Sequence, residues 1–296
     1  MKRYTVGVFD SGIGGLTVLA ECVRRLPGCD YLYYGDNAHA PYGSRSAEEI
    51  THLVRAALRV FSAYGVDAAV LACNTATAVC AQLMRKEFPF PVVGTEPAVK
   101  PAAERCSRAL VLATPRTIGS DRLRSLVKRF PWCAFTLFAP PDLAGAVERA
   151  EGRAEKVKLE DHLPRGNYDG VVLGCTHYVY LRKEISAFYG APVFDGNRGT
   201  AQRLASLLSD GGERGFAGTA DHKSGKTGTA DHCGAKIGTA DHKSGETGTA
   251  DHFGEKRELF DKNGKNSAKT GGKTSIFYLG SGKTVNKRIY EQMFAI

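Results

Sequence analysis

Two stretches of similar design decide the fold: residues 69–75 read Ala-Val-Leu-Ala-Cys-Asn-Thr, and residues 171–177 read Val-Val-Leu-Gly-Cys-Thr-His. Each stretch begins with an apolar run that has the length of a buried strand. The run ends at a cysteine, and polar residues follow the cysteine. The two cysteines, Cys73 and Cys175, are 102 positions apart. We therefore predict that the chain contains two similar halves, each with a cysteine at the end of one strand.

Two further pairs of strand ends support this internal repeat. Residues 6–11 (Val-Gly-Val-Phe-Asp-Ser) correspond to residues 110–115 (Leu-Val-Leu-Ala-Thr-Pro), so that Asp10 matches Thr114 at an offset of 104. Residues 91–94 correspond to residues 192–195 at an offset of 101. A nearly constant offset at three strand ends is hard to obtain by chance. Each half is therefore expected to carry one polar strand end and one cysteine strand end.

Short apolar runs alternate with longer helical patterns along the chain. The expected strands are residues 5–9, 31–34, 68–72, 91–93, 109–113, 170–173, 192–194 and 275–279. Apolar residues recur at helical spacing in residues 47–64, 122–130, 200–208 and 285–294. This alternation predicts an α/β protein with mainly parallel sheets, in which ligands bind at the carboxyl ends of the strands. Two such halves facing each other would place Cys73 and Cys175 on opposite walls of one cleft.

The composition is that of an ordinary globular protein, with 43% hydrophobic and 24% charged residues among 296. The net charge is +9, but the basic residues are scattered and not interleaved with aromatic ones. We therefore expect neither a nucleic-acid nor a membrane partner. The first residues enter a strand without a secretory signal. Eight cysteines without such a signal are typical of reduced thiols, which favours a cytoplasmic location.

A second repeat, of another kind, accounts for much of the high glycine count. From Gly218, a Gly-Thr-Ala-Asp-His pattern recurs at a ten-residue period through Arg257. The repeat is polar and has no periodic apolar face. We therefore interpret it as a disordered or loosely ordered insertion, within about residues 211–275, that has no catalytic role. Its four Asp-His pairs have no spacing that fixes a coordination geometry, so no metal site is predicted.

Two glycine-rich stretches fail as nucleotide-binding motifs. Residues 12–15 (Gly-Ile-Gly-Gly) lie between an expected strand and a helix, but Thr17 stands where the dinucleotide fingerprint needs its third glycine. Residues 280–284 (Gly-Ser-Gly-Lys-Thr) end like a phosphate-binding loop, but Phe277 stands at the place of its first glycine. Neither stretch is therefore predicted to bind a nucleotide.

Cys73 and Cys175 are the best candidates for chemistry. Five other cysteines are expected to be buried structural residues (Cys22, Cys29, Cys80, Cys106 and Cys133), and Cys233 to be an exposed bystander in the insertion. Two thiols on opposite faces of a substrate suit the inversion of a carbon centre, because a thiolate can remove one proton while a thiol supplies another. Asp10 and His177 are the expected local partners in proton transfer.

Two other classes of function remain open on these residues. In a Cys/His hydrolase, Cys175 would be the nucleophile and His177 the base, and Cys73 would be idle. Replacement of Cys73 by alanine separates the two enzymes, because only a hydrolase would survive it. A non-catalytic ligand-binding protein on the same scaffold would exchange no Cα proton of its ligand with the solvent.

The sequence around these residues resembles the cofactor-independent aspartate/glutamate racemase superfamily, and within it the glutamate racemases. The motifs that carry the resemblance are residues 9–18 (Phe-Asp-Ser-Gly-Ile-Gly-Gly-Leu-Thr-Val), 34–36 with 41–43, 71–78, 95–101 and 174–178. The resemblance implies cofactor-free interconversion of L- and D-glutamate, which supplies D-glutamate for peptidoglycan and thus for the cell wall. Racemisation of another acidic amino acid, such as aspartate, is the alternative.

By position, the resemblance implies that Cys73 and Cys175 are the two catalytic acid/bases. It places the following residues at the substrate: Asp10, Ser11, Tyr42, Gly43, Asn74, Thr75, Thr114, Thr117, Thr176 and His177. Hydroxyls, an amide and helix N-termini can bind the carboxylates of glutamate, and Asp10 can meet its ammonium group. Glu148 matches the position of an acidic helper. Val179 and Tyr180 replace a usual Pro and Leu, a change expected to affect packing more than chemistry.

The resemblance also implies a division into domains. Residues 1–96 with 203–296 would form the first α/β domain, which carries the insertion, and residues 97–202 would form the second. The expected fold is two pseudo-symmetric three-layer domains with the active site in the cleft between them. Glutamate is the implied small-molecule partner, and a homodimer is compatible with the family.

Overall fold

The computed structural model describes residues 3–213, 267–270 and 274–280. The decapeptide repeat, Cys233 and the helix expected at 285–294 lie outside these residues. Within them, each predicted strand is present and agrees with the prediction to within about one residue at either end. The helices predicted at 47–64, 122–130 and 200–208 are confirmed as well, the last as part of a longer one.

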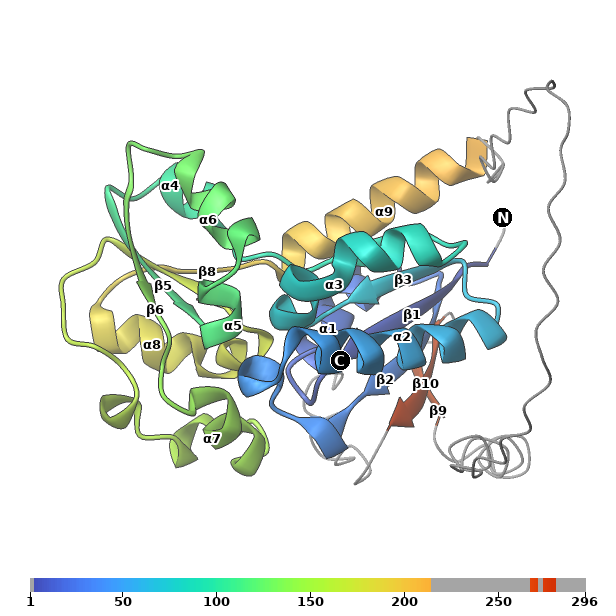
Figure 1. The fold of residues 1–296 in the computed structure, drawn as a ribbon, viewed down its shortest axis with the longest axis horizontal. Coiled ribbons are helices and arrows are strands. Elements are labelled where there is room, and N and C mark those ends of the chain that lie inside the picture. The colour runs from blue at the N-terminus through green and yellow to red at the C-terminus, as the bar shows by residue number, and fades with distance from the viewer. Residues whose placement is uncertain (1–2, 214–266, 271–273, 281–296) are drawn as a thin grey trace, which may run out of the picture. The chain divides into compact units, whose positions relative to one another are not determined.

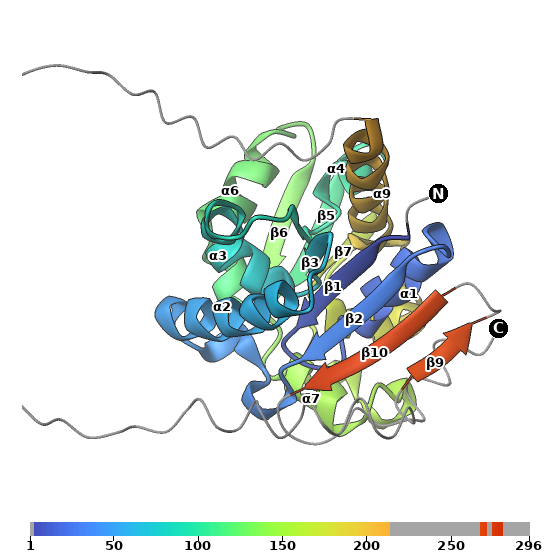
Figure 2. The ribbon, with the colours of Figure 1, turned by 90° about the vertical axis from the view of Figure 1, so that its right-hand side faces the viewer.

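The first sheet combines four strands from the start of the chain with two that follow the insertion (Figure 2). Its order is β4-β3-β1-β2-β10-β9. The strands are β1 (Thr5–Asp10), β2 (Asp30–Gly35), β3 (Ala68–Leu71), β4 (Val92–Gly94), β9 (Ser267–Thr270) and β10 (Thr274–Gly280). All neighbours are parallel except β9, which runs antiparallel to β10. Ile276 of β10 lies opposite Tyr31 of β2, so the first sheet is completed only by residues that follow the insertion.

The second sheet has the order β6-β5-β7-β8, and its neighbouring strands are all parallel. Its strands are β5 (Arg108–Ala113), β6 (Ala134–Phe138), β7 (Gly170–Gly174) and β8 (Val193–Asp195). If β1 to β4 are matched in turn with β5 to β8, the order 4-3-1-2 becomes 8-7-5-6. This agreement confirms the internal repeat that the spacing of the cysteines predicts.

One strand of the second sheet is absent from the prediction. β6 lies at the edge of the sheet, and none of its residues is fully buried. An edge strand contacts a neighbour on one side only, so its sequence shows less of the continuous apolar pattern by which the central strands are recognised.

Helices cover both faces of the first sheet. Its helices are α1 (Leu16–Arg25), α2 (Ala47–Ala63), α3 (Asn74–Glu87) and α9 (Asn197–Glu213), with 3₁₀ turns at η1 (Asn37–His39) and η2 (Tyr42–Ser44). Figure 2 shows α1 and α9 on one side of the strands and α2 and α3 on the other. The alternation along β1 explains this arrangement, because Val6 and Val8 pack with α1 and α9, whereas Phe9 packs with α2 and α3.

The second sheet is covered in the same way by shorter helices (Figure 1). These are α4 (Val99–Ala103), α5 (Pro115–Ile118), α6 (Asp121–Lys128), α7 (Leu143–Arg149) and α8 (Arg182–Tyr189), with 3₁₀ turns η3 (Ala154–Lys156), η4 (Leu159–Asp161) and η5 (Thr176–Leu181). Ala109 and Val111 pack with α4 and α6, whereas Leu110 and Leu112 share a core with α7 and α8. Each sheet therefore forms the middle of a three-layer arrangement.

One apolar core runs through both halves. It includes Val8 of β1 and Leu16 of α1 together with Leu110 of β5, Val171 of β7 and Ile185 of α8. Among the described residues, the two sheets therefore belong to one compact unit. The division into domains at residues 96/97 and 202/203 stays a prediction.

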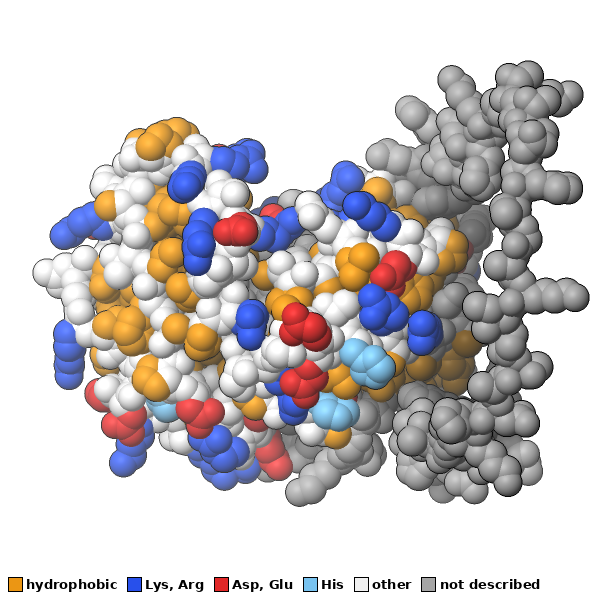
Figure 3. Space-filling view, in the orientation of Figure 1, with side chains coloured by type: hydrophobic (Ala, Val, Ile, Leu, Met, Phe, Trp, Pro, Cys, Tyr) orange, Lys and Arg blue, Asp and Glu red, His pale blue; other side chains and the backbone are white. Residues whose placement is uncertain are grey.

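One face of the molecule shows how its charged side chains are distributed. On the face drawn in Figure 3, lysines and arginines are spread over both halves and alternate with acidic residues. This distribution agrees with the scattered charge in the sequence. Among the described helices, none is long and apolar enough to cross a membrane.

Candidate active site

Both candidate cysteines directly follow the strands predicted to carry them. Cys73 follows β3 and is the N-cap residue of α3, and Cys175 follows β7 and precedes the 3₁₀ turn η5. Their side chains are almost fully buried, with 5% and 7% of each residue exposed. The other five cysteines of the described chain are also buried, which agrees with a structural role for them.

The thiol of Cys73 has neutral hydrogen-bond partners. Its Sγ lies 3.6 Å from the hydroxyl of Ser11, and the backbone N–H of Ala76 donates to it at 3.5 Å. Burial raises the pKa of Cys73 to about 12, and the nearby carboxylate of Asp10 adds to the rise. The charge of Cys175 also contributes to it, which indicates that the two thiols are electrostatically close. In this environment Cys73 is a protonated thiol at neutral pH.

Cys175 has a charged neighbour instead. Nδ1 of His177 lies 3.7 Å from its Sγ, and Nε2 of His177 lies 2.5 Å from Oε1 of Glu148. Burial alone would lower the pKa of His177, but Glu148 and Cys175 raise it well above its ordinary value. Burial would likewise raise the pKa of Glu148, but His177 lowers it. The pair is therefore an imidazolium with a carboxylate, and the imidazolium can donate a hydrogen bond to a thiolate at Cys175.

Asp10 lies where the two halves meet, at the end of β1. Its fully buried carboxylate accepts a hydrogen bond from the backbone N–H of Gly12 at 3.0 Å and one from the hydroxyl of Thr176 at 3.5 Å. Burial raises its pKa, against the opposing charge of His177. Asp10 is an expected partner of Cys73, yet the hydrogen bond to that thiol is made by Ser11.

The glycine cluster at residues 12–15 has a clear structural reason. A Cβ atom on Gly12 would overlap Oε1 of Glu148, and one on Gly14 would lie 2.5 Å from the hydroxyl of Thr176. The backbone N–H of Ile13 donates to Oε1 of Glu148 at 2.9 Å. The cluster that fails as a dinucleotide motif therefore lets the backbone of the first half approach the Cys175 side of the second.

Three threonine hydroxyls join the two halves on the Cys73 side. Oγ1 of Thr114 lies 2.9 Å from that of Thr75 and 3.0 Å from that of Thr117, and Thr75 and Thr117 are 3.4 Å apart. Gly43 packs against this cluster, because a Cβ placed on it would lie 3.0 Å from Cβ of Thr114. Four residues expected at the substrate are thus neighbours in the structure.

Tyr42 and Asn74 are buried as well, but their polar groups bind other protein atoms. The hydroxyl of Tyr42 donates to Asp36 at 2.5 Å, and the second oxygen of Asp36 lies 2.7 Å from Nδ1 of His39. Nδ2 of Asn74 donates to the backbone oxygen of Thr95 at 3.2 Å. Asp36 and His39 are not among the predicted site residues. The signal that could have found Asp36 is its place as the polar residue directly after β2.

Two further phenols that the sequence does not single out for the site contact the glycine cluster. Tyr33 of β2 donates to the backbone oxygen of Gly12 at 2.8 Å, and Tyr180 of η5 donates to that of Ile13 at 3.0 Å. Tyr180 is expected to affect packing more than chemistry, but its hydroxyl reaches from the second half to a loop of the first. No sequence signal links residues 167 positions apart.

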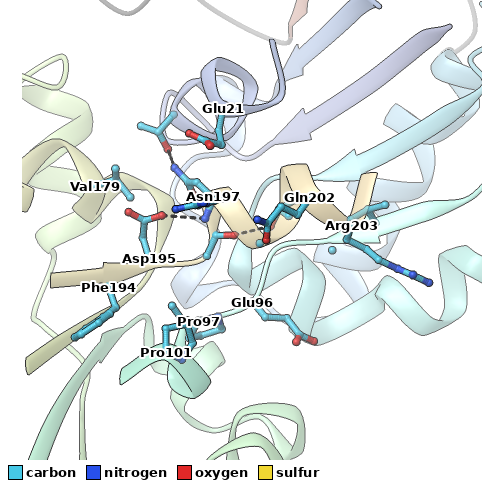
Figure 4. Close-up of a pocket in the computed structure, with 18 of the residues that line it drawn as sticks. Glu21, Glu96, Pro97, Pro101, Val179, Phe194, Asp195, Asn197, Gln202 and Arg203 are labelled. Atoms are coloured by element: carbon cyan, nitrogen blue, oxygen red, sulfur yellow. Dashed lines mark hydrogen bonds between the residues drawn. The ribbon is translucent and has the colours of Figure 1, made fainter. Parts of the chain in front are cut away.

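Two large cavities lie away from the thiols. One of about 1240 Å³ is lined by Val179, Asp195 and Asn197 among others (Figure 4). The other, of about 1070 Å³, lies against α3, α5 and α6. Neither of these two cavities is lined by Cys73 or Cys175. Among the described residues, no group of three or more histidine, cysteine or acidic side chains is placed to hold a metal ion.

Comparison with known proteins gives a consistent family assignment. The sequence pattern of the family described as Asp/Glu/Hydantoin racemase matches residues 10–204. A glutamate racemase of Halothermothrix orenii is 42% identical over 219 residues, which cover 70% of this chain and 86% of that protein. Glutamate racemase 2 of Bacillus subtilis is 35% identical over 217 residues, covering 69% and 82%.

Solved structures agree with the relatives. The glutamate racemase of Escherichia coli, solved in complex with L-glutamate and the activator UDP-MurNAc-ala, matches with a TM-score of 0.63 and 34% identity over 70% of this chain and 83% of that one. A glutamate racemase isoform of Bacillus anthracis matches with a TM-score of 0.61 and 31% identity over 72% and 84%. The α/β architecture with two mainly parallel sheets is therefore shared with these proteins.

Proposed function

The chain belongs to the Asp/Glu/hydantoin racemase family, and from that premise we propose that it interconverts L- and D-glutamate by moving a proton at Cα between Cys73 and Cys175. The protein is thus an amino-acid racemase, an isomerase. One observation carries the assignment of the two thiols: they follow equivalent strands of two repeated sheets, and their neighbours differ in charge.

The difference in charge assigns the starting states of the two cysteines. A thiolate at Cys175, held by the imidazolium of His177, removes the Cα proton, and the electron pair of the C–H bond remains on Cα next to the carboxylate. The thiol of Cys73 then donates its proton to the opposite face of Cα. At the end Cys175 is the thiol and Cys73 the thiolate, and the reverse reaction follows the same path backwards.

The remaining site residues supply binding groups for a small dicarboxylate. Two groups can donate hydrogen bonds to carboxylates. They are the hydroxyl cluster of Thr75, Thr114 and Thr117 and the N-terminus of α3. Asp10 is the buried carboxylate available for the substrate ammonium group. Its hydrogen bonds to Gly12 and Thr176 keep it between the two halves, where Cα of a bound glutamate would lie. Ser11, Tyr42, Gly43, Asn74 and Thr176 complete the proposed substrate site.

The proposal extends to the cellular role. D-Glutamate is a building block of peptidoglycan, so the enzyme would act in cell-wall biogenesis and thereby in maintaining cell shape. A cytoplasmic location fits the mechanism, because both thiols must stay reduced to transfer protons. We propose glutamate as the partner and expect neither nucleic acid nor a membrane, since the basic residues are scattered along the sequence. A homodimer stays a prediction.

The direct test is to incubate the protein with L-glutamate in D₂O, following optical rotation by polarimetry and loss of the Cα proton by NMR. We expect the rotation to fall to zero and deuterium to enter at Cα. Exchange with aspartate but not with glutamate would assign the enzyme to aspartate. No exchange with either substrate would contradict the assignment as a racemase of acidic amino acids.

A further inference from the structure

We propose that Tyr180 is a positioning residue for the Cys175 side of the site, because its hydroxyl holds the glycine loop, residues 12–15, where this loop binds Glu148. The inference rests on the proposed function, since it concerns the residues that prepare Cys175 for proton transfer. It concerns a side chain that touches neither thiol and acts through its neighbours.

A continuous series of contacts leads from Tyr180 to the thiol. The hydroxyl of Tyr180 donates to the backbone oxygen of Ile13 at 3.0 Å, and the N–H of the same residue donates to Glu148 at 2.9 Å. Glu148 contacts His177 at 2.5 Å, and His177 lies 3.7 Å from the sulfur of Cys175. A displacement of the loop would therefore move the carboxylate that holds the imidazolium.

The loop needs such an anchor because of its composition. Ile13 is flanked by Gly12 and Gly14, and glycine backbone has the greatest conformational freedom of any residue. The loop is held from both halves, by Tyr33 at the oxygen of Gly12 and by Tyr180 at the oxygen of Ile13. The Gly12 oxygen belongs to the same peptide group as the Ile13 N–H, so the phenol of Tyr33 also strengthens the hydrogen bond to Glu148.

Tyr180 also contacts the segment that carries Glu148. A Cβ placed on Gly152 would lie 2.8 Å from the Tyr180 ring, and Gly152 has a positive φ of 73° in the turn after α7. The ring thus packs on the turn that follows Glu148, while the hydroxyl binds the loop that Glu148 contacts. Burial raises the pKa of Tyr180, as do Asp10 and Glu148, so the phenol remains a hydrogen-bond donor throughout the neutral range.

The pKa of His177 depends on how firmly the glycine loop holds Glu148, so it can be used to test the role of Tyr180. The charged or titratable groups that face it are Glu148 from α7, Cys175 at the end of β7 and Asp10 at the end of β1. Glu148 raises the pKa of His177, so a less firmly held Glu148 lowers it. The imidazolium is lost as the pH rises through this pKa. The basic limb of the activity profile must therefore move to lower pH when the loop is released.

The first test is Tyr180→Phe, which removes the hydroxyl and keeps the ring. We expect kcat/KM for glutamate to fall about tenfold, the effect of one buried hydrogen bond, and the basic limb of its pH profile to move to lower pH. Tyr189→Phe is the matched control, because its phenol donates to the backbone oxygen of Pro164 at 2.8 Å, away from the thiols. An unchanged pH profile in Tyr180→Phe, or an equal change in Tyr189→Phe, would overturn the proposal.

Two further measurements separate positioning from general damage. In a Glu148→Gln background, Tyr180→Phe should reduce kcat/KM less than twofold, because both changes act on the same series of contacts. A full tenfold loss in that background would overturn the proposal. NMR titration of His177 without substrate should give a lower pKa in Tyr180→Phe than in the wild type and Tyr189→Phe. Because this readout needs no turnover, it tests the loop contact even if glutamate proves not to be the substrate, and an unchanged titration counts against the proposal.

Discussion

The two cysteine strand ends have the same position in their sheets but opposite surroundings. Cys73 has the hydroxyl of Ser11 and a backbone N–H as neighbours, whereas Cys175 has an imidazolium that a carboxylate supports. The repeat of the strand order determines where the thiols lie. The side chains added around each of them make the charge beside the two thiols differ. A symmetric scaffold thus carries two cysteines in unlike surroundings, as the proposed proton transfer across one carbon requires.

The strongest test of this comparison removes each thiol in turn. Cys73→Ser and Cys175→Ser should each lower the racemisation rate by about 10³-fold or more, because a serine hydroxyl is a far weaker acid and base than a thiol. Optical rotation and Cα deuterium exchange measure the loss. Cys80→Ser serves as the control and should stay active, because Cys80 lies on the helix that Cys73 caps and is also buried. Full racemisation activity in Cys73→Ser would contradict the two-thiol mechanism, because one thiol cannot supply the base on one face of Cα and the acid on the other.

Removal of the charge on the Cys175 side should make the two strand ends more alike. Glu148→Gln is expected to lower kcat/KM about 10²-fold. Glu148 raises the pKa of His177, so the variant should have a lower His177 pKa. The imidazolium is then lost at a lower pH, and the basic limb of the activity profile should move to lower pH. A pH profile of kcat/KM measures both effects. Glu151→Gln, whose carboxylate pairs with Arg153 instead, should leave the profile in place.

A smaller effect is expected where the first half contacts the second. Gly14→Ala places a Cβ 2.5 Å from the Thr176 hydroxyl and 2.8 Å from the His177 backbone nitrogen. We expect a loss of about 1–3 kcal/mol in the free energy of unfolding from overpacking, with kcat/KM lowered in parallel. Denaturant unfolding and steady-state kinetics measure the two changes. Gly28→Ala meets no atom within 4 Å and should be close to neutral.

The smallest effect is expected on the Cys73 side, where the bridging contacts are neutral. Thr114→Val removes the hydroxyl shared with Thr75 and Thr117. We expect KM for glutamate to rise about fivefold, the loss of one hydrogen bond, with a smaller change in kcat and an unchanged pH profile. Thr136→Val, at an exposed position of β6, is the control. A displaced pH profile in Thr114→Val would contradict this, because it would mean that residues on the Cys73 side also influence the protonation state on which activity depends.

The fold could be predicted from the sequence wherever burial leaves a continuous apolar pattern. The central strands and both cysteines follow from such runs, and the constant offset between the halves reveals the repeat. β6 was beyond this method because its residues alternate between exposed and half-buried positions at the edge of the second sheet. β10 was predicted although the insertion precedes it, because residues 275–279 form an apolar run of strand length.

The candidate site could be predicted only in part, for a similar reason. Thr176 and His177 are recognised because they directly follow a strand. The roles of Tyr33 and Tyr180 depend on contacts with a glycine loop far away in the sequence, which no local pattern records. The glycine cluster shares features with a nucleotide-binding motif that it does not complete, because a close approach to a phosphate and a close approach to another protein segment need the same absence of side chains.

The place of β10 has a consequence for biosynthesis. The second sheet is built from residues 108–195 alone, so its strands are complete as soon as that stretch has left the ribosome. The outer edge of β2 must wait for Ile276 and its neighbours before it is paired. Until then the nascent chain presents an open strand edge, the kind of surface to which other chains can add. Residues 218–257 prolong this interval by a few seconds at about 5–20 residues per second.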